Sequence, residues 1–297
     1  MNKKYLNPLS YVRPLGSRGY LNWMPDELYL KLCYRAAFHK KLDLKNPKTY
    51  NEKLQWMKLY DRNPLYCTLV DKYAVRSYIA ENLGEEYLIP MVGGPWTDPE
   101  EIDFAALPER FVLKCNHGST TNIICKDKSS LDIPQAKAKL KKWLGTSWFW
   151  YGREWPYKDL KPCIYAEAYM EDEQVGELRD YKFFCFAGKP HYMLLSTDRS
   201  DDAKQTRGDF FDMEYNHMPF RKKHLNAEVM PAKPRNFQAM QELAAKMSKD
   251  LPAVRIDLYD VNGRIYFGEY TFFSGSGFGP FHPAQWDEKL GSLIPLP

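Results

Sequence analysis

Two carboxylates stand on opposite arms of a predicted β-hairpin near the end of the chain. Asp257 lies in a stretch where apolar and polar residues alternate, the period of a half-buried strand, and Glu269 lies in the next strand-like stretch. Asn262-Gly263 between them is a strong signal for a tight turn. Two carboxylates this close repel each other unless a cation or a proton lies between them. Because oxygen-only ligands favour magnesium over zinc, the pair is a candidate magnesium site.

The register of this hairpin decides whether the two carboxylates meet. A two-residue turn sets Asp257 opposite Gly268, so that Glu269 faces the other way. One extra loop residue brings Asp257 opposite Glu269 instead. Arg255 then faces Thr271, and the apolar residues gather on the other face. We expect this second register because it leaves no charge pointing into the core; the alternative is a hairpin whose carboxylates only face water.

The composition is that of an ordinary globular protein. With 297 residues, 44% of them hydrophobic and 27% charged, the chain has room for one large domain or two modest ones. Its net charge of +4 does not support a dedicated nucleic-acid binder, so we expect no nucleic-acid partner.

The cysteine pattern favours a reducing compartment. None of the six cysteines forms a C-x-x-C pair, and no zinc spacing with the histidines is found. We therefore expect a cytoplasmic protein. No apolar run is long enough for a signal peptide or a transmembrane segment.

The hydrophobic periodicity predicts an α+β protein. Residues 1–24 read as an irregular arm, and a helix is expected to open at Pro25. The other expected helices begin at Thr49 or Asn51 and cover residues 69–83, 134–144 and 236–250. Outside the carboxylate hairpin, the expected strands cover residues 111–113, 123–125, 164–168, 180–186 and 191–195.

Two lysines on predicted strands are candidates for phosphate binding. Lys114 ends a strand and precedes a loop of small residues, Gly118-Ser119-Thr120-Thr121. A strand-borne ammonium beside free backbone N–H groups suits a triphosphate. Lys182 lies on a second strand of similar character. The alternative for both is a surface lysine.

The order of these features resembles the ATP-grasp superfamily, and most closely its TupA-like branch, which is linked to teichuronopeptide and other surface-polysaccharide synthesis. The stretches that carry the resemblance are T-Y-N-E-K-L-Q-W-M-K-L-Y-D (49–61), V-D-K-Y-A-V-R (70–76), F-V-L-K-C-N-H-G-S (111–119), Y-G-R-E-W-P-Y-K (151–158), D-Y-K-F-F-C-F-A-G (180–188) and V-R-I-D-L-Y-D-V-N-G-R-I-Y-F-G-E-Y-T-F (254–272). The resemblance implies two α+β subdomains that grip ATP between antiparallel sheets, in residues 69–168 and 169–297, after an N-terminal helical region in residues 1–68.

The resemblance also implies roles for individual residues. Lys114 and Lys182 would contact the ATP phosphates, under a closing loop that contains Gly118 and Ser119. The hinge beneath adenine would be Glu167, Ala168, Tyr169 and Met170, with Glu173 or Gln174 at the ribose. Asp257 and Glu269 would hold Mg2+. Thr271 stands where the superfamily usually has Asn, which leaves open whether one or two metal ions bind.

The implied chemistry is the joining of a carboxylate to an amine. Arg255 and Lys182 would stabilise the transferring phosphoryl group, so that an acyl phosphate forms and an amine attacks it. Ser274, Gly275 and Ser276 would offer backbone donors to the acceptor, although a plain glycine-rich turn is an alternative. Arg153, in the aromatic insert 148–157, would pair with a uronate, unless the insert only packs between helices.

The function implied is that of an ATP-dependent carboxylate–amine ligase. It would amidate a uronic acid of a surface glycan, or of a sugar nucleotide, with an amino acid or another small amine. The resemblance also implies at most a loose association with a membrane polysaccharide-synthesis complex. Two alternatives remain: a phosphotransferase acting on a glycan hydroxyl, and a non-catalytic glycan-binding protein.

Overall fold

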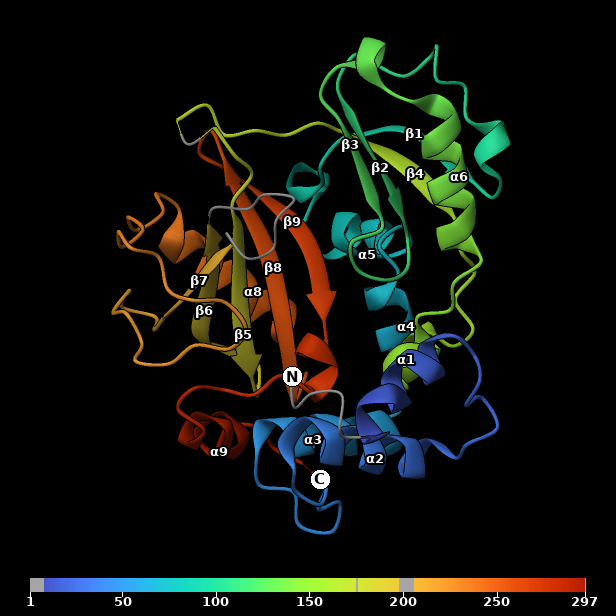
Figure 1. Cartoon of the computed structure of the whole chain (residues 1–297). Helices are drawn as coiled ribbons and strands as arrows, with labels where there is room; N and C mark the ends of the chain where they lie inside the picture. The colour runs from blue at the N-terminus through green and yellow to red at the C-terminus, as the bar shows by residue number, and fades with distance from the viewer. Residues whose placement is uncertain (1–7, 175, 198–205, 297) are drawn as a thin grey trace.

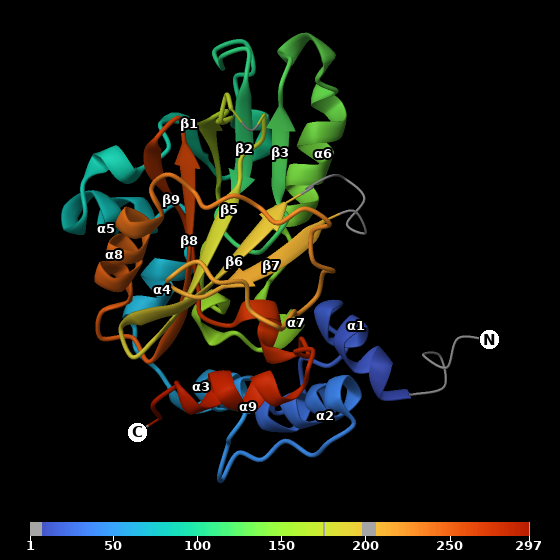
Figure 2. The ribbon, with the colours of Figure 1, turned by 90° about the vertical axis from the view of Figure 1, so that its left-hand side faces the viewer.

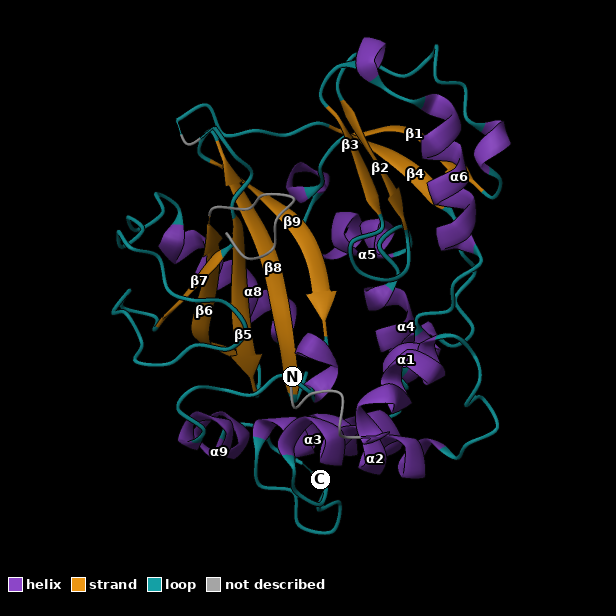
Figure 3. Ribbon diagram, in the orientation of Figure 1, coloured by secondary structure: helices purple, strands orange, loops and turns teal. Residues whose placement is uncertain are grey.

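The protein contains two separate antiparallel β-sheets, one at the upper right of Figure 1 and one to its left. The structure is a computed structural model that describes residues 8–174, 176–197 and 206–296. Helices lie below and around the two sheets (Figure 3). This architecture confirms the predicted α+β class with two antiparallel sheets.

The smaller sheet has the strand order β1-β4-β2-β3. Its strands are β1 (Met91–Trp96), β2 (Phe111–Cys115), β3 (Asn122–Cys125) and β4 (Ile164–Ala168). Phe111 and Leu113 are buried and alternate with partly exposed residues, as expected of a strand with one face in a core. They share that core with Leu140 of α6 (Ile133–Leu144), so α6 covers one face of the sheet.

The larger sheet has the strand order β7-β6-β5-β8-β9. Its strands are β5 (Asp180–Phe186), β6 (Lys189–Thr197), β7 (Arg207–Phe211), β8 (Ala253–Val261) and β9 (Arg264–Thr271). Helix α8 (Phe237–Ser248) packs on one face, where Met240 and Ala244 meet Phe183 and Ile256. The charged residues Lys182 of β5 and Arg255 and Asp257 of β8 lie on the opposite face. Asp260, near the end of β8, instead lies at the start of α8, where it accepts from the backbone N–H of Asn236 at 3.2 Å.

Helices from the N-terminal part of the chain complete the larger sheet's core. The remaining α-helices are α1 (Val12–Ser17), α2 (Asp26–Phe38), α3 (Tyr50–Tyr60), α4 (Leu65–Val70), α5 (Val75–Asn82), α7 (Phe149–Gly152) and α9 (Gln285–Ser292). A capping box between Thr49 and Glu52 begins α3, so Thr49 is the cap of the two expected candidates, Thr49 and Asn51. Leu54 of α3 and Ile79 of α5 are fully buried in the core of the larger sheet. Residues of α3, α4 and α5 thus pack in the core of the larger sheet. The implied division into subdomains at 69–168 and 169–297 stays a prediction.

The helix expected over residues 69–83 is broken in its first half. Helix α4 ends before Asp71, whose Oδ1 accepts the backbone N–H groups of Tyr73 and Ala74 at 2.9 and 3.0 Å. Such a local side-chain bond competes with the helical backbone pattern and begins α5 afresh. The prediction of one continuous helix is therefore wrong, and the break frees Lys72 to reach the space between the sheets.

The β8–β9 hairpin brings Asp257 opposite Glu269, as predicted, but the extra residue lies in a strand and not in the turn. The turn has only two residues, Asn262 and Gly263, with φ of 51° and 80°, the left-handed conformation of a tight hairpin turn. The extra residue is Gly268, a bulge inside β9. A Cβ on Gly268 would lie 2.8 Å from the backbone oxygen of Asp257, so the bulge requires glycine. The predicted longer loop is wrong, and the predicted pairing is confirmed.

Candidate functional site

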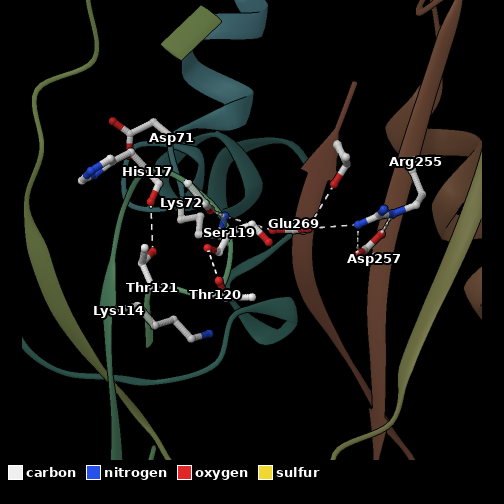
Figure 4. Close-up of polar contacts among 12 residues, drawn as sticks. Asp71, Lys72, Lys114, His117, Ser119, Thr120, Thr121, Arg255, Asp257 and Glu269 are labelled. Carbon is white, nitrogen blue, oxygen red and sulfur yellow. Dashed lines mark hydrogen bonds and ion pairs between the residues drawn. The ribbon is translucent and has the colours of Figure 1, made fainter. Parts of the chain in front are cut away.

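The carboxylates of Asp257 and Glu269 are held together by cationic side chains of the protein (Figure 4). Arg255 donates from Nε and Nη2 to the two carboxylate oxygens of Asp257, each at 2.6 Å. Its Nη2 also donates to Oε1 of Glu269 at 3.0 Å. The Nζ of Lys182 lies 2.8 Å from Oδ2 of Asp257. The structure thus brings four of the predicted site residues into one cluster.

Charge is balanced within this cluster. Lys182 also lies 2.6 Å from Asp180, and Lys72 lies 3.0 Å from Glu269, so three cations face three carboxylates. Burial opposes ionisation of Glu269, but Lys72 and Arg255 outweigh it and hold the pKa of Glu269 well below its usual range. Burial works against the charge of Arg255 too, but Asp257 keeps the pKa of that guanidinium above its usual range. Glu269 and Arg255 are therefore charged at neutral pH, whereas burial raises the pKa of Asp257 against the opposing effect of Arg255 and Lys182.

Lys72 is a site residue that the sequence reading missed. Its Nζ donates to the backbone oxygen of Gly118 at 2.8 Å and lies 3.0 Å from Oε2 of Glu269. Lys72 therefore joins the small-residue loop of the smaller sheet to the carboxylate pair of the larger one (Figure 4). The signal that was available is Asp71, a common helix-capping residue inside an otherwise helical stretch.

The small-residue loop after β2 has the shape of a tight turn with a free tip. Gly118 and Thr120 have φ of 81° and 61°, and Thr121 donates from Oγ1 to the backbone oxygen of His117 at 3.0 Å. Ser119 at the tip is exposed. The tip faces solvent beside Lys72, which is the geometry expected of a loop that could meet a phosphate.

Lys114 lies in a separate cluster on the smaller sheet. Its Nζ forms an ion pair with Oε2 of Glu167, and Nη1 of Arg76 lies 2.7 Å from Oε1 of the same carboxylate. Glu167 is 7% exposed at its side chain and Lys114 is 22% exposed. The structure thus brings together two predicted nucleotide contacts, and adds Arg76, which the sequence reading did not single out.

The glycine-rich loop after β9 touches the carboxylate cluster through one residue. Arg255 donates from Nη1 to Oγ of Ser274 at 3.2 Å. Gly275 and Ser276 have φ of 61° and 55°, a left-handed turn. Ser276 is buried, and the Nζ of Lys58 donates to its backbone oxygen at 2.8 Å and to its Oγ at 3.0 Å. Exposed Gly275 therefore remains a candidate substrate contact, whereas Ser274 and Ser276 are both buried and their side chains already bond within the protein.

The sequence was compared with protein-family models and with solved structures. The model described as TupA-like ATPgrasp matches residues 52–295.

The chain belongs to the TupA-like ATP-grasp family.

The match contains every site residue described above and leaves out the helices before residue 52. No curated protein matches the sequence.

Three solved structures are among those similar to this TupA-like protein. They are D-alanine–D-alanine ligase from Bacillus anthracis complexed with ATP (14% identity, TM-score 0.40, 69% of this chain and 55% of that one), N5-carboxyaminoimidazole synthase from Aspergillus clavatus with ADP and 5-aminoimidazole ribonucleotide (13%, 0.43, 77% and 53%), and the ATP-grasp ligase PsnB with minimal precursor, Mg and ADP (12%, 0.39, 88% and 68%). The chain spans about half the length of the first two. At these scores the assignment rests on the family match alone.

The predicted hinge of the TupA-like protein borders a hollow of about 370 Å3. Tyr169 and Glu173 line it together with Arg110, whose guanidinium lies 4.2 Å from the centre of the Tyr169 ring. The backbone N–H of Ala168 donates to the oxygen of Pro90 at 2.9 Å, so this donor is not available to a ligand. Met170 instead packs in a small apolar cluster beside the hairpin.

Arg153 does not reach the site. Its side chain is 0% exposed, and its guanidinium lies 4.4 Å from the ring centres of Tyr29 and Trp150. Nη2 donates to the backbone oxygen of Leu21 at 2.7 Å, and Nε lies 3.2 Å from Asp26. Arg153 holds the N-terminal helices against the aromatic insert, so the expected contact with a uronate is wrong for this conformation.

The donor set fits magnesium, with one condition. The described residues contain no group of three or more His, Cys, Asp or Glu side chains that could hold a metal ion. Asp257 and Glu269 supply two hard carboxylates, and the Oγ1 of Thr271, which donates to Glu269 at 3.0 Å, adds a neutral oxygen. Since the cluster is already neutral, a lone divalent cation would unbalance it. The residues therefore suit magnesium that arrives with a negatively charged phosphate.

Proposed function

We propose that this TupA-like protein is an ATP-dependent carboxylate–amine ligase that works through an acyl phosphate. The observation that carries the proposal is the neutral cluster of Arg255, Asp257, Glu269 and Lys72 beside the Gly118 loop. Such a cluster offers cations to phosphates and carboxylates to magnesium, and it lies between the two sheets that an ATP-grasp fold uses to hold its nucleotide.

The cations of the cluster would change partners when ATP binds. Lys72 and Lys182 would turn from Glu269 and Asp257 to the phosphate oxygens, since a triphosphate carries more negative charge than either carboxylate. Asp257 and Glu269 would then be free to hold magnesium, with Thr271 beside them. Bound there, magnesium would neutralise the charge on the transferring phosphoryl group.

The residues of this chain would then support two successive transfers. A carboxylate oxygen of the acceptor attacks the γ-phosphorus as the bond to ADP breaks, which forms the acyl phosphate. Arg255, next to Ser274, is placed to stabilise the charge on that group. An amine then attacks the acyl carbon, phosphate leaves and the nitrogen loses a proton. Gly118 and Ser119 would cover the site and exclude water.

The acceptor we propose is a uronic acid of a surface glycan or sugar nucleotide, and the amine is an amino acid or a similarly small amine. This choice follows the TupA-like resemblance, and the reaction would take place in the cytoplasm, where ATP is available. Lys114, Arg76 and Glu167, with the hollow beside Tyr169 and Glu173, would bind the rest of the nucleotide.

The test supplies the protein with magnesium-ATP, a set of uronic acids and a mixed pool of amines. A ligase releases ADP and phosphate in equal amounts and forms an amide. ADP release with a phosphorylated sugar and no free phosphate would identify a phosphotransferase instead.

The matched variant is Arg255→Lys, which keeps one positive charge but cannot bridge both carboxylates. This variant should retain nucleotide binding, while its turnover falls by about 100-fold or more. Nucleotide binding without ADP release in any mixture would overturn the proposal.

A further inference from the structure

The surface of residues 11–28 exposes large apolar side chains that the core does not use. They are Tyr11 (48% exposed), Leu15 (37%), Tyr20 (67%), Trp23 (75%) and Leu28 (46%), and we call them the N-terminal patch. The N–H of Tyr20 donates to the oxygen of Leu15 at 3.1 Å, and Nε1 of Trp23 donates to the oxygen of Tyr20 at 3.1 Å. These bonds place the three side chains in one neighbourhood at the start of the chain.

The patch is not the unpaired side of an incomplete core. Tyr29, Leu30 and Cys33 of α2 are fully buried and pack in a cluster of their own with Phe278. The opposite face of α2 carries the exposed residues Leu28, Lys31 and Arg35, three and four positions apart. Helix α2, which lies below α1 in Figure 2, therefore has a satisfied inner face. On its outer face Leu28 lies beside the exposed ion pair of Glu27 and Lys31, and Arg35 lies one turn further on.

Charge is segregated toward the same end of the chain. Residues 1–50 contain 10 basic and 3 acidic residues, a net charge of +7, whereas the whole chain carries +4. The rest of the chain is therefore net negative, at −3. Among the described residues of this region, the exposed basic side chains are Arg18, Lys31, Arg35, Lys40, Lys41, Lys45 and Lys48. A basic surface thus adjoins the N-terminal patch through α2.

We propose that the N-terminal patch docks on an anionic lipid membrane surface. Trp23 and Tyr20 are the side chains that favour the level of the lipid headgroups, because each has an apolar ring and a polar edge. The neighbouring lysines and arginines would lie against the headgroup phosphates. No helix among the described residues is long and apolar enough to span a bilayer, so the contact lies on the surface.

Charge favours a membrane over a second copy of the chain. The patch lies before residue 52, outside the region matched by the ATP-grasp family. Two copies paired through this face would bring the exposed basic side chains of both copies together, and like charges across an interface oppose association. An anionic lipid surface can bind both the exposed aromatic rings and the neighbouring basic side chains.

The experiment is co-sedimentation of the full chain with vesicles of phosphatidylcholine, alone or with about 30% phosphatidylglycerol. The wild type should sediment with the anionic vesicles, and this binding should weaken as the salt concentration rises. Tyr20→Ser/Trp23→Ser should reduce the partition coefficient by about tenfold or more. The Lys40→Gln/Lys41→Gln variant should also have a lower partition coefficient, and its partition coefficient should depend less on the salt concentration. Val229→Ser, at an 83% exposed residue outside the patch, should bind like the wild type.

Several results would overturn the proposal. One is equal sedimentation of the wild type and the Tyr20→Ser/Trp23→Ser variant, and another is equal binding to vesicles with and without anionic lipid. A dimer in ultracentrifugation that Trp23→Ser disperses would assign the patch to a second copy instead. All substituted side chains are exposed, so the variants should have the melting temperature of the wild type. If the double variant is less stable, the single Trp23→Ser variant replaces it in the test.

Discussion

The Nζ of Lys72 lies 3.0 Å from Oε2 of Glu269, and this ion pair links a break between two helices to the edge strand of the larger sheet. The same Nζ holds the backbone oxygen of Gly118 at 2.8 Å. Lys72 thus occupies the space between the carboxylate pair and the small-residue loop. A phosphate entering that space would meet the ammonium group first.

Lys72→Met should weaken nucleotide binding. Magnesium-ATP should stabilise the wild type by roughly 2–4 kcal/mol at about 100 to 1,000 times its dissociation constant, and the variant should lose most of this gain. Thermal unfolding with and without magnesium-ATP measures the difference. Lys137→Met is the control, because that lysine pairs only with the exposed Glu100 in the described structure. An unchanged shift in Lys72→Met would remove Lys72 from the phosphate site.

Asp257→Asn and Glu269→Gln should differ in their cost to the ligand-free protein. Asp257 is 1% exposed and pairs with two cations, so neutralising it leaves buried positive charge and should cost about 3–5 kcal/mol. Glu269 is 30% exposed, and its loss should cost about 1 kcal/mol.

Both changes should abolish the stabilisation by magnesium-ATP, because the remaining carboxylate cannot hold the metal alone. Urea unfolding measures the loss of stability in the ligand-free protein, and calorimetric titration measures the binding of magnesium-ATP. Glu242→Gln, at an exposed carboxylate on α8, should alter neither quantity. Retention of full magnesium-ATP binding by Glu269→Gln would contradict the metal assignment.

Gly268→Ala should disturb the pairing of the two carboxylates. The added Cβ would lie 2.8 Å from the backbone oxygen of Asp257, closer than such contacts allow, and we expect a loss of about 1–3 kcal/mol. Gly145→Ala is the matched control, since its Cβ would meet nothing nearer than 3.7 Å. Unfolding curves for both variants make the comparison. Equal stability of the two would mean that the bulge tolerates a side chain.

Lys222→Met should change how stability depends on pH. Burial over Tyr50 and Phe281 lowers the pKa of Lys222 to about 7, although Asp287 acts in the opposite direction. An unfolded lysine titrates near ~10.4, so between about pH 7 and 10 the unfolded state binds more protons and stability rises with pH.

The methionine variant lacks this contribution. Its stability advantage over the wild type should be largest near about pH 7 and should shrink as the pH approaches about 10. Denaturant unfolding of both proteins across this range measures the difference, and the other titrating groups cancel in the comparison. A difference that does not vary with pH would show that Lys222 keeps its ordinary pKa in the folded protein.

The sequence by itself determined most of the helices and strands and the residue types of the site, although not the break at Asp71 within the helix expected over residues 69–83. Local patterns were sufficient for this: strand alternation placed Asp257, the capping pair Thr49 and Glu52 began α3, and Asn262-Gly263 made the turn. These signals depend on neighbours within a few residues, so the chain carries them before it folds. The ATP-grasp resemblance rested on the same local stretches and is confirmed by the family match.

The tertiary structure alone decided which charges meet. Lys72 reaches Glu269 across nearly two hundred residues of chain. Lys114 pairs with Glu167 on a neighbouring strand, and Arg153 is buried among aromatic rings beside Asp26. The strength of an ion pair depends on the distance between the charges and on their burial, and the local periodicity of the sequence predicts neither. The bulge at Gly268 belongs to the same class, because its place depends on which residues of β8 and β9 must share the core face.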